Sequence, residues 1–219
     1  MEIYKKNLKK LIKGNVYNPR DEHDACGVGF VASTEGKKSR QVVEFGIQAL
    51  KAVWHRGAVD VDGKTGDGAG IHIEIPKDFF VERIENGGRR HDKGEICIGM
   101  IFLPRNDYVT QEKCKTIVEN ELLNKDYYIY RWRQVPVNTH VLGVKAENNR
   151  PEIVQVIFKS NNLNLKEDAL ERDLFVIRKK IEKQSSNLKI NDFYISSFSS
   201  RSIIYKGMFL AESLSDFYP

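Results

Sequence analysis

The sequence lacks any long apolar run, and it contains few cysteines. No segment approaches the ~18 consecutive apolar residues of a membrane-spanning helix, so we expect no membrane partner. The three cysteines, at positions 26, 97 and 114, lack metal-site spacing, and their odd number argues against a disulfide framework. Free cysteines are typical of a reducing compartment, which predicts a cytoplasmic protein without a bound metal.

A strong charge of one sign is also missing. The 219 residues include 35 Lys and Arg and 30 Asp and Glu, a net charge of +5. The densest basic segments are Arg89-Arg90 and 130–133, and we interpret both as solvated faces. Because the charge is otherwise dispersed, we predict no nucleic-acid partner.

The first residues form a separate segment. Residues 1–13 contain five lysines and helically spaced apolar side chains at Tyr4, Leu8, Leu11 and Ile12, which predicts a short amphipathic helix. The segment lacks the apolar core of a signal peptide and the arginines of a transit peptide. Pro19 and an acidic run separate it from one domain that we expect to begin near residue 26.

Periodicity predicts alternating helices and strands in that domain. We expect Ser39 to cap a helix, Asn164 and Glu167 to form a capping box, and the glycine-rich stretch 57–70 to be a loop. This pattern favours a layered α+β fold. The predicted strands are 27–32, 70–75, 95–103, 127–135, 152–158, 192–197 and 202–205, and the predicted helices are 39–54, 78–85, 108–123 and 164–183.

Three short motifs suggest chemistry. Cys26 lies in Asp-Ala-Cys-Gly-Val-Gly-Phe, His55-Arg56-Gly57 follows it, and Thr-Gly-Asp-Gly-Ala-Gly occupies 65–70. A single cysteine is more often a buried small hydrophobe than a nucleophile. The 65–70 segment lacks the lysine of a phosphate-binding P-loop. It is the combination of the three motifs at this spacing that favours a catalytic role for Cys26.

This combination resembles the start of the class II glutamine amidotransferases. The resemblance implies that residues 1–25 are a propeptide, that cleavage makes Cys26 the first residue, and that its thiol attacks the side-chain amide of glutamine. A thiol needs to lose its proton before it attacks, and a free α-amine, with a pKa near 8, can accept that proton. The resemblance also implies the four-layer αββα sandwich of the N-terminal nucleophile hydrolases over residues 26–219.

Four further residues are expected near the substrate: Gly27, Arg56, Gly57 and Asp67. A cation such as Arg56 beside the thiol would favour the thiolate. Arg56 is equally compatible with a structural ion pair to Asp60 or Asp62, and both interpretations stay open. The small residues around Asp67 would leave room for glutamine.

Longer matches are similar to the glutamate synthases in particular. They cover 49–71, 197–208 and 210–219. The resemblance implies that the complete enzyme transfers ammonia to 2-oxoglutarate, with the remainder of its large subunit and an NADPH-oxidising small subunit as partners. FMN and an iron–sulfur cluster would bind in the complete enzyme, and we expect no cofactor in this chain.

Several family residues have no counterpart before Pro219. These are the Asn-Gly pair of the oxyanion hole, and the arginine and aspartate that bind the substrate. Since oxyanion donors contribute a large part of the rate, we expect a partial, incomplete domain and little activity from residues 1–219 alone. The alternatives are a catalytically inactive interaction module, or the amidotransferase domain of another class II enzyme.

Overall fold

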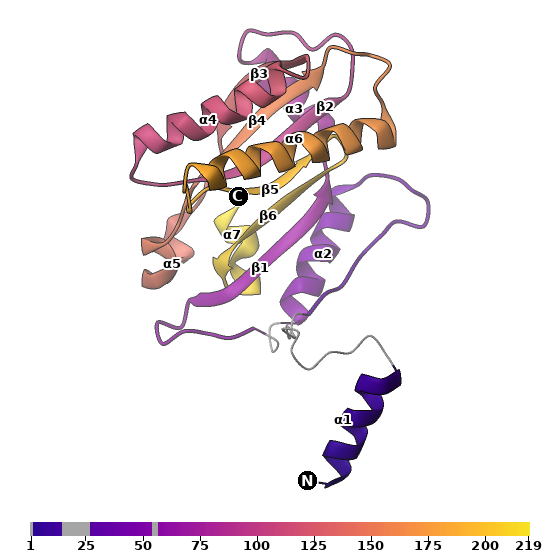
Figure 1. Ribbon diagram of the computed structural model, residues 1–219, viewed down its shortest axis with the longest axis vertical. Helices are drawn as coiled ribbons and strands as arrows, with labels where there is room; N and C mark the ends of the chain where they lie inside the picture. Colours follow the sequence, from indigo (N-terminus) through magenta and orange to yellow (C-terminus); the bar gives the residue numbers. More distant parts are fainter. Residues whose placement is uncertain (1, 15–26, 54–56) are drawn as a thin grey trace.

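The computed structural model describes residues 2–14, 27–53 and 57–219, and it confirms a mixed α+β chain with antiparallel sheets (Figure 1). The helices are α1 (Glu2–Gly14), α2 (Arg40–Ala52), α3 (Lys77–Glu85), α4 (Tyr108–Leu123), α5 (Val144–Asn148), α6 (Glu167–Asn187) and α7 (Leu214–Phe217). The strands are β1 (Thr65–Glu74), β2 (Ile96–Leu103), β3 (Tyr127–Gln134), β4 (Glu152–Ser160), β5 (Tyr194–Ser199) and β6 (Ser202–Phe209). Among the described residues, no helix is long and apolar enough to cross a membrane.

The larger sheet has four strands in the order β3-β4-β2-β5, and every neighbouring pair is antiparallel. Its central strand β2 is apolar along nearly its whole length because both of its faces are covered. Cys97 and Ile101 point into one hydrophobic core, and Ile98 and Met100 point into another. This sheet therefore separates two cores.

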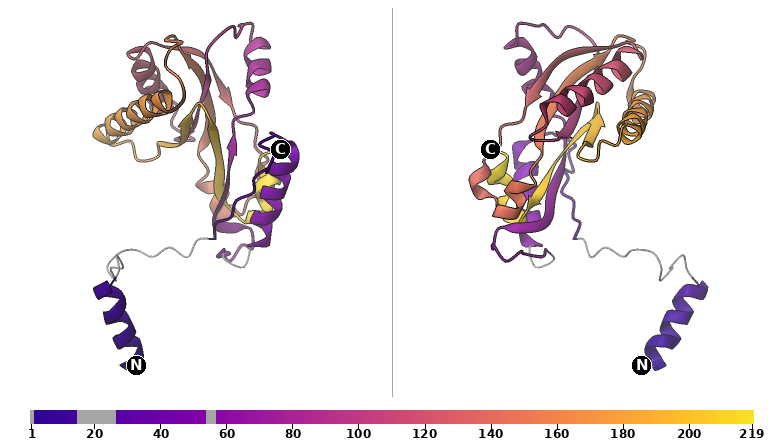
Figure 2. Two further views of the ribbon diagram at one scale, coloured as in Figure 1. Left: turned by 90° about the vertical axis from the view of Figure 1, so that its right-hand side faces the viewer. Right: turned by 60° about the vertical axis from the view of Figure 1, so that its left-hand side comes forward.

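Helices α4 and α6 cover one face of the four-stranded sheet (Figure 2). Apolar side chains such as Val118 and Leu174 pack there against Phe158 of β4. The helix α4 begins where the sequence predicts, because the Asp107 carboxylate caps it by accepting a hydrogen bond from the Thr110 amide at 2.9 Å. This layer contains the first core.

The second core lies on the opposite face, between the four-stranded sheet and a two-stranded sheet of β1 and β6. The β1–β6 pairing is antiparallel, with a register shift between Thr65 and Ala69. Helix α2 lies against the outer side of β1 through half-buried Ile47 and Leu50. Ser39 caps α2 as predicted, since its hydroxyl accepts a hydrogen bond from the Val42 amide.

Two predictions about the glycine-rich segments are wrong. Residues 27–32 are not a strand: Val28 and Phe30 are exposed, since no described strand lies beside this segment to complete a ladder. The loop predicted over 57–70 ends early, because β1 begins at Thr65. A Cβ on Gly66 would lie 2.7 Å from the Phe209 carbonyl oxygen, so the glycine lets β6 approach closely enough to pair.

The capping box predicted at Asn164 is also wrong. Helix α6 has Lys166 as its N-cap residue, and Lys166 makes no side-chain capping bond. Asn162 forms the local turn instead, since its side chain accepts a hydrogen bond from the Asn164 amide at 3.0 Å and its carbonyl accepts one from Leu165. This turn delays the start of the helix.

Strands β5 and β6 follow each other directly but belong to different sheets. The two strands form no backbone ladder with each other, and hydrogen bonds of serine side chains connect them instead. The Ser197 hydroxyl accepts a hydrogen bond from the Ile204 amide at 3.2 Å, and the Ser196 hydroxyl donates to the Ile204 carbonyl at 3.3 Å. The chain thereby passes from the larger sheet to the smaller one within one turn.

Candidate active site

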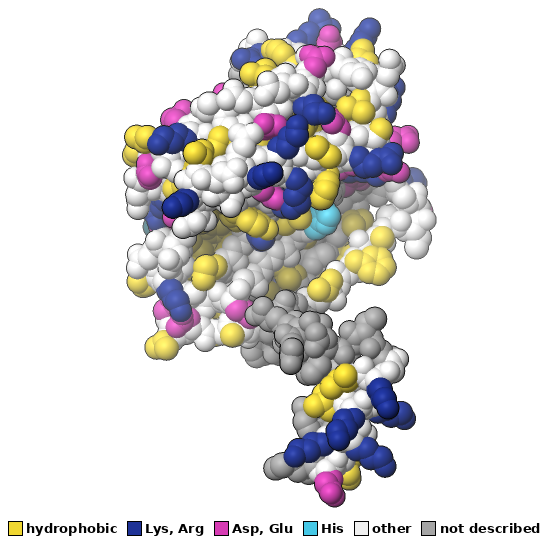
Figure 3. Space-filling model, viewed as in Figure 1, with side chains coloured by type: hydrophobic (Ala, Val, Ile, Leu, Met, Phe, Trp, Pro, Cys, Tyr) yellow, Lys and Arg dark blue, Asp and Glu magenta, His cyan; other side chains and the backbone are white. Residues whose placement is uncertain are grey.

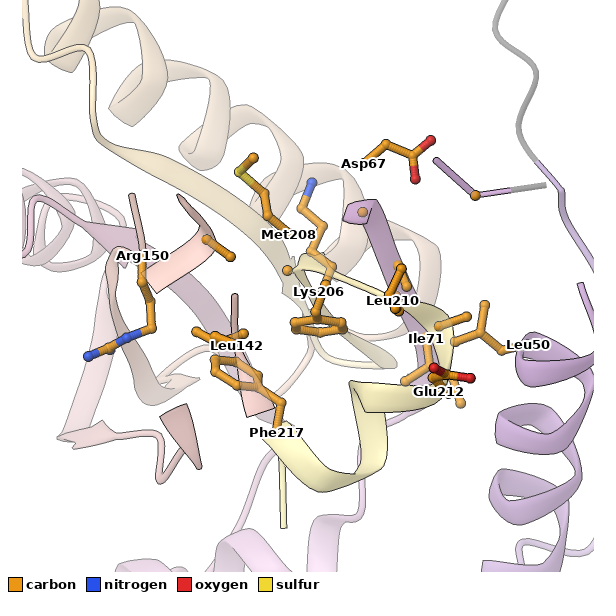
Figure 4. Close-up of a pocket in the computed structure, with 18 of the residues that line it drawn as sticks. Leu50, Asp67, Ile71, Leu142, Arg150, Lys206, Met208, Leu210, Glu212 and Phe217 are labelled. Carbon is orange, nitrogen blue, oxygen red and sulfur yellow. The ribbon is translucent and has the colours of Figure 1, made fainter. Parts of the chain in front are cut away.

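One cavity of about 940 Å³ brings together three of the five residues that the sequence singles out (Figure 4). Gly27, Gly57 and Asp67 all line it, although they are far apart in the chain. The other two, Cys26 and Arg56, lie outside the described residues. Since Gly27 follows Cys26 directly, the cavity wall begins one residue after the proposed nucleophile.

Strands β1 and β6 form the floor of the cavity, and glycines allow the two strands to lie close. A Cβ on Gly70 of β1 would lie 2.8 Å from the Lys206 Cβ and 2.9 Å from the Tyr205 carbonyl oxygen, both on β6. In the space-filling view, the face crossed by these strands is hollowed below α6 (Figure 3). The glycines at 66–70 therefore serve strand pairing as well as leaving space in the cavity.

Apolar side chains line most of the cavity. They come from α2, β1, β6, α7 and the segments beside α5, and they include Leu50, Ile71, Leu142, Met208, Leu210 and Phe217. Sequence reasoning missed those in 142–217, because nothing in their local motifs marks a cavity. The one available signal was the alternation of apolar and polar residues in β6, and that pattern indicates a strand rather than a functional site.

Four charged side chains also line the cavity, and two of them have partners. The Lys206 ammonium donates a hydrogen bond to the Tyr194 hydroxyl at 2.8 Å, and Arg150 forms an ion pair with Glu147 at 3.0 Å. Asp67 and Glu212 form no ion pair with any described residue. Figure 4 shows the Asp67 and Glu212 side chains among the residues that line the cavity, and both bring negative charge to it.

The loop between Gly57 and β1 is fixed by its own carboxylates. Asp62 accepts hydrogen bonds from the Thr65 amide at 2.7 Å and the Thr65 hydroxyl at 2.6 Å, and these bonds hold its pKa well below the usual range. Asp60 forms an ion pair with Lys145 of α5 at 2.7 Å, and its hydrogen bond from Lys145 likewise lowers its pKa. Both proposed partners of Arg56 thus already have partners among the described residues.

Within the part of the chain that the structure describes, no three His, Cys, Asp or Glu side chains lie close enough to hold a metal ion. The cavity instead offers an apolar wall, glycine backbone and the carboxylates of Asp67 and Glu212. A site of this kind suits a small polar molecule whose orientation is fixed by a few polar groups.

The comparison with known families assigns the class of protein. The chain belongs to the class II glutamine amidotransferases, whose family model matches residues 26–219.

Within that class, the chain is similar to the large chains of glutamate synthases. It is 55% identical over 216 residues to the NADPH glutamate synthase large chain of Azospirillum brasilense, covering 99% of this chain and 14% of that protein. It is 39% identical over 201 residues to the ferredoxin-dependent glutamate synthase of Pyropia yezoensis, covering 90% of this chain and 13% of that protein. The chain thus spans a small part of the length of these relatives.

Proposed function

We propose that this chain supplies the glutaminase site of a glutamate synthase, with Cys26 as the nucleophile and glutamine bound in the cavity beside Gly27. The observation that carries the proposal is that Gly27, Gly57 and Asp67 line one cavity. The family match begins at residue 26, which supports placing the start of the domain at Cys26 and the propeptide at 1–25.

The reaction requires a free α-amine on Cys26. The amine takes the thiol proton, and the thiolate attacks the side-chain carbonyl carbon of glutamine. The same proton then goes to the departing nitrogen, so that ammonia leaves and a thioester remains. Water hydrolyses the thioester to glutamate and restores the thiol. Arg56 would favour the thiolate through its positive charge, and the small residues around Asp67 would leave room for glutamine.

We further propose that the complete protein passes the ammonia to 2-oxoglutarate and reduces the product to glutamate. The remainder of a large subunit and an NADPH-oxidising small subunit would be its partners in the cytoplasm. FMN and an iron–sulfur cluster would carry the electrons outside this chain. An iron–sulfur cluster is typically held by four cysteine thiolates, whereas this chain has three cysteines, of which Cys97 lies on β2 and Cys114 on α4.

The arrangement of layers supports the finer assignment of the fold. Helices α4 and α6, the four-stranded sheet, the β1–β6 sheet and α2 follow one another in that order (Figure 2). We propose that these are the four layers of an N-terminal nucleophile hydrolase sandwich.

The test combines mass and activity. The mass of the purified protein, expressed from its complete gene, should show loss of residues 1–25. Cys26→Ser should abolish ammonia release from glutamine, while ammonia-dependent glutamate formation continues. Cys114→Ser is the matched control, since Cys114 is buried in α4. Retention of glutamine-dependent activity in Cys26→Ser, or its equal loss in Cys114→Ser, would overturn the proposal, and an inactive wild type would favour an interaction module.

A further inference from the structure

The two basic segments at 89–90 and 130–133 meet in the structure, together with Arg83 of α3. The Arg89 guanidinium donates a hydrogen bond to the Ile129 carbonyl at 2.6 Å. The Arg131 guanidinium donates to the Arg83 carbonyl at 3.1 Å. These contacts hold α3 beside the edge strand β3, at the end of the sheet where Figure 1 labels both. The basic residues are therefore clustered in space and not dispersed.

Two of these arginines lie over one aromatic ring. Arg83 lies over the half-buried Phe79 ring with its Cζ 4.8 Å from the centroid, and the Arg133 Cζ lies 5.3 Å from the same centroid. Arg133 is held by the fully buried Gln155, whose side-chain oxygen accepts its hydrogen bond at 2.9 Å. Burial lowers the pKa of Arg133, and the charges of Arg83 and Arg131 lower it further.

The positive charge of this cluster is poorly compensated within the described residues. Among the described residues, the one ion pair recorded for Arg83, Arg131 or Arg133 is that of Arg83 with Glu82, at the long distance of 4.0 Å. Neither Arg131 nor Arg133 forms an ion pair with a described residue. The Arg83 Nε atom is buried and has no hydrogen-bond partner in the described part of the chain. A buried donor without a partner is costly, and the Arg83 side chain as a whole is 42% exposed, so a carboxylate can approach its outer nitrogens.

We propose that Arg83, Arg131 and Arg133 form a carboxylate-binding site that docks an acidic segment of a partner protein. None of the three lines the cavity beside Gly27, so the site is separate from the proposed glutamine site. Guanidinium groups bind carboxylates in a bidentate manner. Arginine and aromatic side chains are also the groups enriched at the centres of protein interfaces, and both Phe79 and the 42% exposed Tyr128 lie in or beside the cluster.

A protein segment fits this cluster better than a nucleic acid. A nucleic acid needs an extended basic track that follows successive phosphates, whereas Arg83 and Arg133 lie over the same ring and Arg131 bonds to the Arg83 carbonyl. A free small anion would be held weakly at such an exposed edge. A peptide adds apolar contact with Phe79 and Tyr128 to the ion pair.

The test uses the full 219-residue chain and a labelled hexaglutamate peptide ending in phenylalanine, with the hexaglutamine analogue as the neutral probe. Binding is measured by fluorescence anisotropy at fixed ionic strength. Arg83→Gln and Arg131→Gln should each weaken binding by about tenfold or more, because each removes a charge-assisted hydrogen bond. Arg90→Gln is the matched control: it removes the same charge from an exposed neighbouring arginine and should change binding less than about twofold.

The outcomes separate the possible ligands. Equal weakening by Arg90→Gln and Arg83→Gln would show unspecific attraction and overturn the site. Preferential binding of a 20-base oligonucleotide, or saturation of the site by inorganic phosphate alone, would overturn the choice of an acidic protein segment. Thermal unfolding of each variant shows whether it is folded. If Arg83→Gln is unfolded, the peptide affinity of Arg131→Gln alone decides whether the proposed site exists. None of these measurements involves glutamine, so the docking site and the glutaminase proposal stand or fall independently.

Discussion

The Glu171 carboxylate on α6 accepts a hydrogen bond from the Ser200 hydroxyl at 2.7 Å, at the turn where the chain leaves the larger sheet. It also accepts one from the Ser200 amide at 2.8 Å and one from the Ser199 hydroxyl at 2.9 Å. Both serines are buried, so they depend on this carboxylate for their hydrogen bonds. One side chain of α6 thereby fixes the turn between β5 and β6.

Glu171→Ala should therefore destabilise the chain by about 1–3 kcal/mol, because it leaves buried donors without a partner. The free energy of unfolding in urea measures the effect. Asp168→Ala is the control, since it removes a neighbouring α6 carboxylate that pairs with Arg201 in solvent, and its effect should be much smaller. If the two substitutions lowered the free energy of unfolding equally, Glu171 would not have the special role in fixing the β5–β6 turn.

Gly66→Ala should destabilise the chain by about 1–3 kcal/mol, the usual range for overpacking. The added Cβ would lie 2.7 Å from the Phe209 carbonyl oxygen and 2.8 Å from its carbon, and a backbone cannot rotate away. The variant should also widen the cavity floor. Gly29→Ala is the comparison, because no described atom lies within 4 Å of a Cβ built at that position. If the free energy of unfolding of Gly66→Ala equalled that of the wild type, β1 and β6 would have to pair less closely than described.

The thiols of Cys97 and Cys114 should be unreactive in the folded chain. Both are fully buried, and burial raises the pKa of Cys114 to about 11 and that of Cys97 further. Few thiolates then exist at neutral pH. In a Cys26→Ser variant, a chromogenic disulfide reagent should label no thiol rapidly, and it should label both remaining thiols after unfolding in guanidinium. A fast-reacting thiol in that folded variant would contradict the prediction.

Stability should fall as the pH drops below about 6.5, the ordinary pKa of histidine. Burial lowers the pKa of His91, and Lys159 adds to this, while Asp92 and Glu95 oppose it. The unfolded chain then binds a proton that the folded chain does not. The contribution of neutral His91 to stability is complete above the ordinary histidine pKa. It is lost as the pH falls toward the lowered pKa that His91 has in the folded chain.

Urea unfolding between about pH 7 and pH 5 measures this dependence. His91→Gln should flatten the curve, and His140→Gln, at an exposed position, should leave it unchanged. A wild-type curve that rises as the pH falls through this range would contradict the direction of the shift.

Local signals predicted much of the fold. The limits of α4 follow from Asp107 and from periodicity, and β2 follows from its unbroken apolar run. The predictions failed where the secondary structure of a segment depends on pairing with a strand that is distant in the sequence. The start of β1 depends on β6, and the segment after Gly27 has a strand-like sequence but no described partner strand.

The candidate site divides in the same way. Short motifs marked Gly27, Gly57 and Asp67, and the structure places all three on one cavity. The roles of Cys26 and Arg56 stay predictions, since both lie outside the described residues. Leu142, Met208 and Phe217 reach the cavity only through tertiary packing, which no local pattern of residues encodes.

The pairing of β1 with β6 has a consequence for the order of folding. Ile71 pairs with Tyr205, so the ladder closes a loop that contains the whole four-stranded sheet. Closing so long a loop is entropically costly until the intervening sheet has formed, and distant pairings form late. During synthesis the ribosome has to release β6 before the cavity floor exists. Any maturation step that needs a formed cavity therefore has to wait until the chain has emerged from the ribosome through the end of β6.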